Sequence, residues 1–427
     1  MGRAMALIAR DLLPVLHRLP PARRYVVGFS GGLDSTVLLH VLVSLRDELP
    51  PLQAVHVNHG LQAQAANWEK HCAQVCQDFD CPLDILHVDA RPSDGESPEA
   101  AARSARYDAL REYCRQGDLL LTAHHQDDQA ETLLNQLLRG AGPAGLSAMP
   151  RVAPFSPSTW HARPLLEVTR PELKAYAEAA GLTWIDDPTN TDTHLARNYF
   201  RHHVMPVLTQ HWPSAGATLA RAARHQAEAW ALLQTLGRQD IETGQGSRPD
   251  CLSVQALRRL PTNRARNAIR VWLHDKGLPM PSEARLARIL EDVLTAGEDR
   301  MPCVDWPGAE VRRYRDDLYA FAPLPPHDPT TIYKWDPSEP LELSSLNLCL
   351  TQQDLLDLGV DVAALDGPLS VRFRQGGERC HPKGRQETHE LKKLLQEEGV
   401  PPWERERIPL VYAGERLIAA VGFWACE

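Results

Sequence analysis

Residues 30–35, Ser-Gly-Gly-Leu-Asp-Ser, have the types and spacing of a loop that binds phosphate. They follow a short apolar run at residues 25–29 and precede apolar residues at helical spacing from 36 to 42. This order predicts a strand, a tight turn and a helix N-terminus, a geometry in which unpaired backbone N–H groups gather around an anion. The alternative interpretation is an ordinary serine-glycine turn.

The residues of this loop add to the predicted anion site. Gly31 and Gly32 permit positive φ and leave no Cβ between the backbone and a phosphate. Ser30 and Ser35 supply hydroxyl donors, and Asp34 supplies a carboxylate able to hold a metal ion beside the phosphates. The G-x-x-x-x-G-K-[ST] spacing is missing, so the loop is not a P-loop of that class.

A second segment, residues 122–132, combines two adjacent histidines with three acidic residues. At a helix N-terminus, this spacing puts His124 and Asp128 on one face and Asp127 and Glu131 on the next. Helix capping by acidic residues and a two-metal site are the alternative interpretations. Capping explains one acid, but not the whole set at the end of a strand, so the segment predicts a catalytic site.

These two segments need a fold that brings them together. Strand-like and helix-like stretches alternate along the first two hundred residues, with strands at 25–29, 52–58, 83–88 and 118–123 and helices at 65–78 and 98–115. Strands separated by helices predict the α/β class with a doubly wound parallel sheet. Ligands bind at the carboxyl ends of such strands. Three strands end there in polar residues, which we expect to converge on one site: Ser30, Asn58-His59 and His124-His125.

Three further groups of residues are weaker candidates. His56 and Asn58 stand at a strand end, where a buried, hydrogen-bonded histidine is the alternative interpretation. Arg103 and Arg106 lie on adjacent helical turns and either meet phosphates or pair with nearby acids. The stretch Arg197-Asn198-Tyr199-Phe200-Arg201 suits phosphate and base contacts, or equally a salt bridge that closes a domain.

The rest of the chain divides into further regions. Residues 140–164 are rich in glycine, proline and serine and predict a long mobile loop, followed by a helix that starts at Thr169 or Arg170. Helical spacing dominates from 215 to 294, and six prolines between 322 and 340 are typical of a linker. We therefore predict four regions: an α/β domain at 1–212, a helical domain at 215–322, a proline-rich linker at 323–365 and a small α+β domain at 366–427.

Composition indicates a globular cytoplasmic protein. The chain has 427 residues, 43% of them hydrophobic and 24% charged, which is enough for two or three domains. No uncharged run approaches a membrane span. The nine cysteines are scattered and include no C-x-x-C pair, which predicts reduced thiols with no disulfide framework and no zinc site.

Although the net charge is −9, the basic residues form two clusters along the sequence. One lies between 254 and 290, where only Asp275 and Glu283 oppose eight basic side chains, and the other lies between 372 and 393. Solvated helix faces are the alternative interpretation. Two such clusters downstream of a nucleotide site favour an RNA partner.

Together these segments resemble the tRNA(Ile)-lysidine synthetase family of the PP-loop ATP pyrophosphatase superfamily. In the first half, the resemblance depends on SGGLDS, HVNHGL, the EAAAR–RY helix, TAHHQDDQAETLLNQLLRGAGPAGLSAM, RPLL and the Asp186–Arg201 stretch. Near the C-terminus it depends on RQGGER, LKKLLQEEGVPPWER and IPLV. It therefore spans nearly the whole chain and implies an adenine nucleotide alpha hydrolase-like first domain.

The resemblance also implies a reaction. The wobble cytidine of a CAU-anticodon tRNA(Ile) attacks the α-phosphate of ATP through its C2 oxygen, pyrophosphate leaves, and the ε-amine of free L-lysine then displaces AMP at C2. ATP and Mg²⁺ are the implied cofactors, with the metal at Asp34. The implied ATP-binding residues are Ser30, Gly31, Gly32, Leu33, Asp34, Ser35, His56 and Asn58.

Catalytic and tRNA-binding residues are implied in the same way. The catalytic set is Asp34, His125, Asp127, Asp128 and Glu131, in which the last three acids contact lysine or metal and His125 or His124 stabilises charge on phosphate. The tRNA-binding set is Arg103, Arg197, Asn198, Arg201, Arg264, Arg266, Arg270, Arg374 and Arg379. A homodimer is a further expectation, and no membrane partner is expected.

Two alternatives remain at this point. A cytidine thiolase of the same superfamily would need a pair of cysteines near the loop, and the C-x-x-C motif is missing. A tRNA-binding protein without turnover would not need the intact Asp34 and the acids of residues 127–131.

Overall fold

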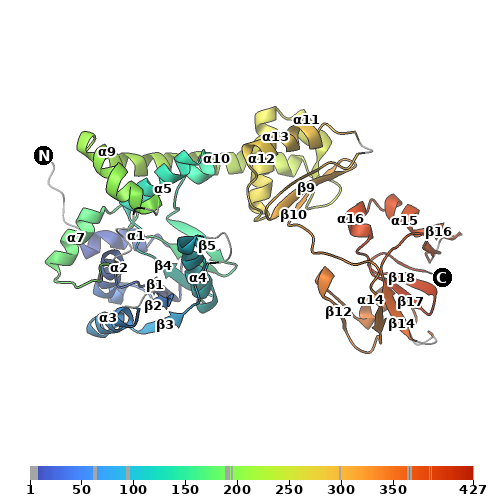
Figure 1. Cartoon of the computed structure of the whole chain (residues 1–427), viewed down its shortest axis with the longest axis horizontal. Coiled ribbons are helices and arrows are strands. Elements are labelled where there is room, and N and C mark those ends of the chain that lie inside the picture. The colour runs from blue at the N-terminus through green and yellow to red at the C-terminus, as the bar shows by residue number, and fades with distance from the viewer. Residues whose placement is uncertain are drawn as a thin grey trace. The chain divides into compact units, whose positions relative to one another are not determined.

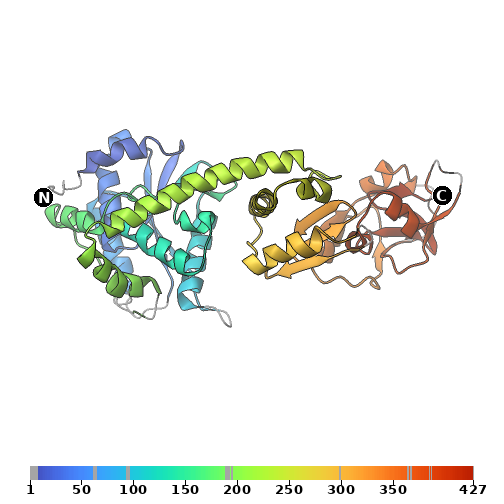
Figure 2. The same cartoon turned by 90° about the horizontal axis from the view of Figure 1, so that it is seen from above.

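The computed structural model describes residues 8–60, 65–92, 97–187, 193, 196–297, 300–362, 365, 368–383, 385 and 387–426. The chain separates into two compact units, Met1–Leu233 and Gln234–Glu427 (Figure 1, Figure 2). Part of the Asp186–Arg201 stretch, residues 188–192 and 194–195, lies outside the described residues, as does Leu61 of HVNHGL. Among the described residues, no helix has the length and apolar character needed to cross a membrane.

A six-stranded sheet forms the centre of the first unit, in the order β3-β2-β1-β4-β6-β5. Its strands are β1 (Arg24–Gly28), β2 (Leu52–Asn58), β3 (Leu83–His87), β4 (Asp118–Leu121), β5 (Val152–Ser156) and β6 (Thr159–Ala162). All neighbouring pairs are parallel except β5 with β6. The predicted parallel sheet is confirmed.

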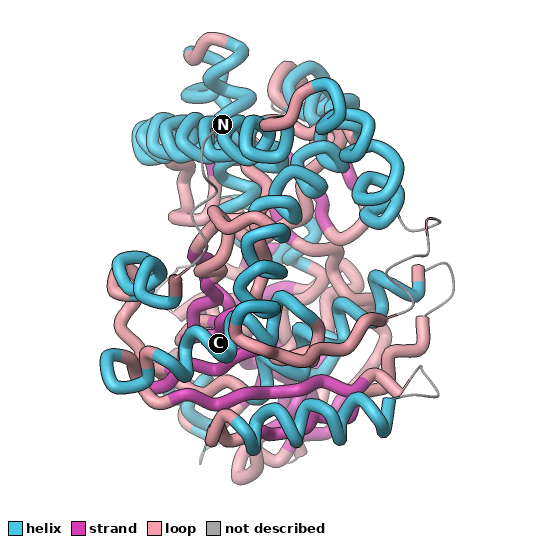
Figure 3. The backbone as a smooth tube through the Cα atoms, turned by 90° about the vertical axis from the view of Figure 1, so that its left-hand side faces the viewer, coloured by secondary structure: helices cyan, strands magenta, loops and turns pink. Residues whose placement is uncertain are grey.

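Helices cover both faces of this sheet (Figure 1, Figure 3). They include α2 (Leu33–Ser44), α3 (Ala65–Asp78), α4 (Pro98–Tyr113), α5 (Gln126–Leu138) and α7 (Arg170–Ala179), preceded in the chain by η1 (Ala9–Leu12) and α1 (Leu13–Leu16). Leu119 and Leu121 of β4 pack in one core with α2, α3 and α7, whereas Leu120 packs with Leu110 of α4 on the opposite face. This alternation along β4 is what a doubly wound sheet requires, because successive strand residues point to opposite faces.

The long loop predicted for residues 140–164 is wrong. The segment contains α6 (Pro143–Leu146) and the strands β5 and β6, and His161 of β6 is in register with Leu120 of β4. Glycine, proline and serine mark only the turns of this segment. The strands between them have four and five residues, too few to show an alternating pattern among turn-forming residues.

The helix predicted to start at Thr169 or Arg170 is confirmed. Thr169 is the N-cap of α7: its hydroxyl accepts from the backbone N–H of Glu172, whose carboxylate accepts from the backbone N–H of Thr169. The unit continues through α8 (Ala196–Tyr199), the π-helical η4 (Phe200–Val204) and α9 (Met205–His211). The 29-residue α10 (Ala215–Thr243) begins in this unit and ends in the second one.

The first part of the second unit is helical, as predicted, and also contains a sheet that was not predicted. Its helices are α11 (Val254–Arg259), α12 (Thr262–Asp275), α13 (Glu283–Arg288) and the π-helical η5 (Ile289–Val293). They pack on an antiparallel sheet in the order β7-β10-β9-β8, formed by β7 (Leu252–Ser253), β8 (Cys303–Trp306), β9 (Ala309–Tyr314) and β10 (Asp317–Phe321).

The C-terminal part is built on a sheet in the order β11-β14-β17-β18-β19. These strands are β11 (Tyr333–Trp335), β14 (Leu369–Arg372), β17 (Leu410–Ala413), β18 (Arg416–Ala420) and β19 (Trp424–Ala425), and around them lie β12 (Leu341–Leu343), β13 (Leu348–Leu350), α14 (Gln352–Asp357), β15 (Arg379–Cys380), β16 (His389–Glu390), α15 (Leu391–Glu397) and α16 (Pro402–Arg405). Trp335, Leu343 and Leu355, from the segment predicted as a linker, share a core with Val371 and Val411. The division of the chain into four regions stays a prediction.

The prediction of reduced thiols is wrong for two of the nine cysteines. Cys380 and Cys426 are bonded, with their Cα atoms 5.1 Å apart. They are 46 residues apart in sequence, and an antiparallel bridge between Pro382 and Cys426 brings them together. Sequence spacing does not reveal such a contact. The other seven cysteines are free thiols, and Cys72 and Cys76 lie on α3 as predicted.

Candidate active site

The loop at residues 30–35 joins β1 to α2, as the sequence predicts. Gly31 has φ +77°, whereas Gly32 has φ −78° and is the N-cap of α2. Of the two glycines that permit positive φ, Gly31 adopts it and Gly32 does not. The carbonyl of Gly31 accepts from the N–H of Ile185 at 2.9 Å, which fixes one side of the loop.

Hydroxyl groups hold the loop in shape from within. The Ser35 hydroxyl donates to the carbonyl of Gly32 at 3.0 Å and lies 3.0 Å from the Ser30 hydroxyl. The Thr36 hydroxyl donates to the same carbonyl at 3.0 Å. Leu33 packs its side chain into the core, so it can offer an anion only its backbone N–H. First-turn N–H groups of a helix have no intrahelical acceptor, so the N-terminus of α2 offers backbone donors suited to an anion.

Replacing Gly31 by alanine is expected to lower the free energy of unfolding by about 1–3 kcal/mol. A Cβ at this position would lie 2.9 Å from Cys72 Sγ and 2.9 Å from Ile185 Cδ1, on a backbone that L residues rarely adopt. Gly32→Ala is the matched control, because its Cβ would meet only ordinary contacts at 3.5 Å or more. Urea unfolding of the two variants checks this. Equal losses would contradict the assignment of strain to Gly31.

The two histidines and three acids follow β4 at the start of α5. His125 is the N-cap of α5, and its N–H donates to Asp128 Oδ2 at 3.0 Å. Its imidazole is fully buried among three carboxylates: Nε2 lies 3.5 Å from Asp34 Oδ2 and 3.6 Å from Asp128 Oδ2, and Nδ1 lies 3.6 Å from Asp127 Oδ2. The structure thus brings the phosphate loop and residues 124–131 together, as the sequence predicts.

These carboxylates keep His125 charged. Burial by itself lowers the pKa of His125, but the carboxylates of Asp127, Asp34 and Asp128 outweigh it and raise the pKa to about 9. Burial tends to raise the pKa of Asp127, yet its contact with His125 and the N–H of Arg170 lower it overall. Near neutral pH the site therefore contains an imidazolium surrounded by carboxylates.

His125 is expected to make stability fall as pH rises. Because its folded pKa of about 9 exceeds its ordinary value of 6.5, its contribution is complete below pH 6.5 and is lost as pH rises through about 9. This contribution is at most about 3 kcal/mol. Urea unfolding of the wild type and of His125→Gln at several pH values checks this. The difference between the two proteins should shrink through that window, and a pH-independent difference would contradict the charged state.

Two arginines form ion pairs with the buried acids Asp128 and Glu131. Arg197 Nε donates to Glu131 Oε2 at 3.0 Å and its terminal nitrogen pairs with Asp128. Arg201 Nε donates to Glu131 Oε1 at 2.8 Å, and one of its terminal nitrogens lies 3.2 Å from Asp128 Oδ1. The side chains of Asp128 and Glu131 are 5% and 3% exposed, whereas that of Asp127 is 36% exposed. Burial would raise the pKa of Asp128, but the charges of Arg197 and His125 hold it below its ordinary value.

These ion pairs agree with the second interpretation of residues 197–201, in which the arginines form salt bridges within the protein. Arg197 and Arg201 pair with acids inside the first unit, and Asn198 is 7% exposed. Their assignment to tRNA stays a prediction. The sequence does not reveal the pairing, because 66 to 73 residues separate the arginines from the acids.

A second group of polar side chains lies behind His124, and the sequence analysis did not identify it as a group. Thr122 Oγ1 lies 2.8 Å from His124 Nδ1 and 2.8 Å from His161 Nε2, and a terminal nitrogen of Arg163 lies 3.1 Å from His161 Nδ1. Arg163 is the first residue of the RPLL motif, which was the available signal. Its position depends on β6, within the segment predicted as a loop.

His56 and Asn58 hold the end of β2. His56 is buried, and its Nδ1 lies 2.9 Å from the carbonyl of Phe29 and 3.5 Å from Cys72 Sγ. Asn58 donates to Glu69 and accepts from the N–H of Gly60. These contacts fit the alternative interpretation of a hydrogen-bonded strand end, and their role in ATP binding stays a prediction.

The other predicted tRNA contacts are mostly paired within the chain. Arg103 lies over the Tyr107 ring at 5.0 Å. In the second unit, Arg264 pairs with Asp240, Arg266 and Arg270 pair with Glu283, Arg374 pairs with Glu378 at 3.7 Å, and Arg379 donates to the carbonyl of Thr388. Asp240 and Asp292 therefore also oppose the first basic cluster, beyond the two acids counted within it.

Asp34 is suited to a magnesium ion that is shared with phosphates. Its Oδ1 is buried without a hydrogen-bond partner among the described residues. Mg²⁺ in nucleotide sites takes one or two carboxylates and completes its shell with phosphate oxygens and water. Within the described parts of the chain, no three His, Cys, Asp or Glu side chains form a metal-binding group, so the two-metal alternative gains no support there.

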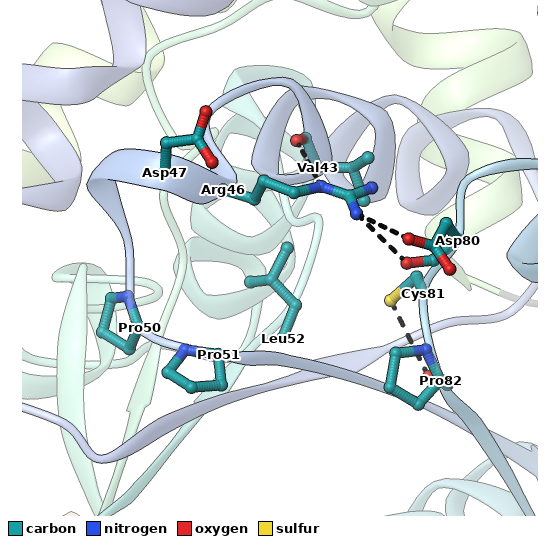
Figure 4. Close-up of a pocket in the computed structure, with 9 residues that line it drawn as sticks. All are labelled: Val43, Arg46, Asp47, Pro50, Pro51, Leu52, Asp80, Cys81 and Pro82. Carbon is teal, nitrogen blue, oxygen red and sulfur yellow. Dashed lines mark hydrogen bonds and ion pairs between the residues drawn. The ribbon is translucent and has the colours of Figure 1, made fainter.

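A pocket of about 270 Å³ lies at the opposite end of the sheet (Figure 4). It is lined by residues just before β2 and β3, including Pro51 and Pro82, and by Arg46, which donates to Asp80. The amino ends of parallel strands do not form the ligand crevice of such sheets. The candidate site is therefore the cluster around Asp34 and His125.

Comparison with known proteins adds three family matches and close full-length relatives. The models match a PP-loop domain at residues 6–208, a TilS substrate binding domain at 252–319 and a TilS substrate C-terminal domain at 369–427. A tRNA(Ile)-lysidine synthase of Coxiella burnetii is 40% identical over 427 residues, covering 100% of this chain and 94% of that protein. Those of Methylococcus capsulatus and Alkalilimnicola ehrlichii are 43% and 44% identical, covering 95% and 94% of this chain and 92% and 90% of theirs.

Proposed function

This chain belongs to the tRNA(Ile)-lysidine synthase family, and we propose that it is an ATP-dependent ligase that forms lysidine on tRNA(Ile). The observation that carries this is the buried contact between Asp34 of the phosphate loop and His125 of the acidic cluster, 3.5 Å apart. It supports a nucleotide site beside carboxylates that suit an amine nucleophile. The cytidine thiolase alternative is not favoured, because the full-length relatives are lysidine synthases.

The first step that we propose is adenylation of the wobble cytidine of a CAU anticodon. Its C2 oxygen forms a bond to the α-phosphorus of ATP, and the bond to pyrophosphate breaks. The N–H groups from Gly31 to Ser35 hold the leaving phosphates, and Asp34 is the residue that would hold Mg²⁺. A bound Mg²⁺ neutralises phosphate charge during this displacement.

The second step that we propose is attack by the ε-amine of free L-lysine on C2, with loss of AMP. The ammonium form must first be held and must then lose a proton to become nucleophilic. Four carboxylates, of Asp34, Asp127, Asp128 and Glu131, face three cations, of His125, Arg197 and Arg201. Asp34 is assigned to Mg²⁺, and a carboxylate is the group that binds an ammonium ion, so Asp127, Asp128 and Glu131 are our candidates for lysine contact.

The target cytidine must leave the anticodon stack to reach this site, which anticodon loops permit at little cost. We propose that Arg103 and the basic residues of the second unit contact tRNA phosphates, and such contacts weaken steeply with salt. Since tRNA and ATP are cytoplasmic, we infer that the reaction takes place there. A homodimer stays a prediction, which sedimentation equilibrium of the purified chain tests.

The test is to incubate the purified protein with ATP, Mg²⁺ and radiolabelled lysine. One reaction contains a CAU-anticodon tRNA(Ile) and the other the methionine tRNA that shares this anticodon. Label entering only the isoleucine tRNA, with release of AMP, is the expected result. Release of AMP without labelled tRNA would support the adenylation step and overturn lysine as the nucleophile. If neither AMP nor labelled tRNA forms, the proposed function is overturned.

A further inference from the structure

Four side chains form a continuous hydrogen-bonded chain behind the active site, in the order Arg163, His161, Thr122 and His124. The three contacts measure 3.1, 2.8 and 2.8 Å. Arg163 is anchored at its other terminal nitrogen, which donates to the carbonyl of Pro150 at 2.8 Å. His161 and Arg163 are 3% and 8% exposed, so the inner half of this chain is shielded from water.

Because Arg163 can only donate, it determines which atom donates and which accepts in each hydrogen bond of this series. A guanidinium only donates, so His161 Nδ1 must accept. His161 is then neutral with its proton on Nε2, and that N–H donates to Thr122 Oγ1. The Thr122 hydroxyl proton needs an acceptor, and His124 Nδ1, at 2.8 Å, is the one within reach. His124 therefore carries its own proton on Nε2.

Burial and nearby cations keep both imidazoles neutral. Burial lowers the pKa of His161 to about 2, with a further lowering from the charge of Arg163. Burial likewise lowers the pKa of His124 to about 3, against the charge of Asp128, which raises it, and together with the charges of Arg163, Arg197 and Arg106, which lower it further. Neither ring gains a second proton near neutral pH, so the tautomers set by the hydrogen bonds persist.

The hydrogen-bonded series ends at His124, whose Nε2 is available to a further acceptor. His124 Nε2 makes no hydrogen bond to a described residue, and it is not among the buried atoms that lack one. His124 directly precedes His125, the residue that contacts Asp34 of the phosphate loop. The positive charges of Arg106 and Arg197 lower the pKa of His124. An N–H donor at this place, where three arginines act on the ring and one carboxylate, that of Asp128, opposes them, suits an anionic phosphate oxygen.

We propose that Arg163, His161 and Thr122 are positioning residues that lock His124 in its Nε2–H tautomer, so that His124 donates a hydrogen bond to a phosphate oxygen during adenylation. The identity of the acceptor rests on the proposed function, whereas the tautomer depends on the hydrogen bonds alone. Without the lock, an imidazole divides its proton between the two ring nitrogens, and part of the population offers the reacting phosphate a lone pair instead of a donor.

The first experiment measures the tautomer directly in the full-length protein. Ring ¹⁵N and ¹H correlations of selectively labelled histidine distinguish Nδ1–H from Nε2–H, and the His124→Gln and His161→Gln spectra assign the two signals. We expect both rings to be neutral Nε2–H tautomers across neutral pH. A mixed or Nδ1–H state of His124 in the wild type would overturn the proposal, whether or not the protein forms lysidine.

The second experiment compares Thr122→Val with Thr122→Ser. Valine keeps the shape and the methyl group of threonine but breaks both hydrogen bonds, whereas serine keeps the hydroxyl. We expect kcat for tRNA-dependent pyrophosphate release to fall about 10-fold or more in Thr122→Val with little change in KM for ATP, and to stay within about twofold in Thr122→Ser. The His124 tautomer should become mixed only in the valine variant.

These measurements separate the possible failures. Loss of kcat with an unchanged His124 tautomer in Thr122→Val would overturn the positioning role, because the effect would then be structural. An unchanged kcat with a mixed tautomer would overturn the donor role of His124. If Thr122→Val does not fold, the wild-type tautomer and the rate of Thr122→Ser still decide the outcome. A wild-type protein without AMP formation but with the locked tautomer would contradict the proposed function alone.

Discussion

Asp34→Asn is expected to lower kcat/KM for lysidine formation by about 10³-fold. The substitution is nearly isosteric but removes the charge of a carboxylate whose Oδ1 is buried without a hydrogen-bond partner, at the N-terminus of α2. It also removes one of the three carboxylates around His125. Because Asp34 is proposed to act at the phosphates of ATP, the substitution should abolish the adenylation step. Pyrophosphate release that depends on tRNA, measured without lysine, tests this.

Asp47→Asn is the matched control for this prediction. Asp47 is exposed in η2 (Arg46–Glu48), beyond the C-terminal end of α2, so the substitution removes the same charge far from the loop. Its activity should stay within about twofold of the wild type, as is usual for an exposed position. If Asp34→Asn released pyrophosphate at the wild-type rate, Asp34 would have no role at the phosphates.

The parts of this site that follow one another in sequence were predictable. The apolar run, the glycine turn and the helix of residues 25–42 are local patterns, and each matches β1, the loop and α2. The acids of residues 127–131 fall at a helix start for the same reason. The meeting of the two segments followed from the rule that strand ends of a parallel sheet converge.

The parts that depend on contacts between distant segments were not predictable. The pairing of Arg197 with Glu131 requires η4 and α8 to return to α5, and nothing in the local pattern of either segment specifies this. The position of His161 requires β6 to pair with β4, although its strand is only four residues long. A single sequence shows which residues suit a task, but the partner that neutralises each charge depends on tertiary packing.

Asp128→Asn is expected to separate the two steps of the reaction. Asparagine retains an oxygen that accepts from the N–H of His125, so the start of α5 survives. The charge that faces Arg197 and Arg201 is lost, and the free energy of unfolding should fall by about 3 kcal/mol because buried cations lose a partner. If Asp128 also helps to hold the lysine ammonium, transfer of labelled lysine to tRNA should fall about 10²-fold or more, with pyrophosphate release far less affected.

The double variant Asp128→Asn, Arg201→Gln distinguishes a lysine contact from a purely structural role. Removing Arg201 restores the charge balance, since Arg197 then pairs with Glu131 alone, and stability should recover. Lysine transfer should remain low if the carboxylate binds the substrate, because no compensating charge replaces it. Recovery of both stability and lysine transfer would show that Asp128 acts only as the partner of the arginines, and Asp127 would then be the remaining exposed carboxylate for the ammonium group.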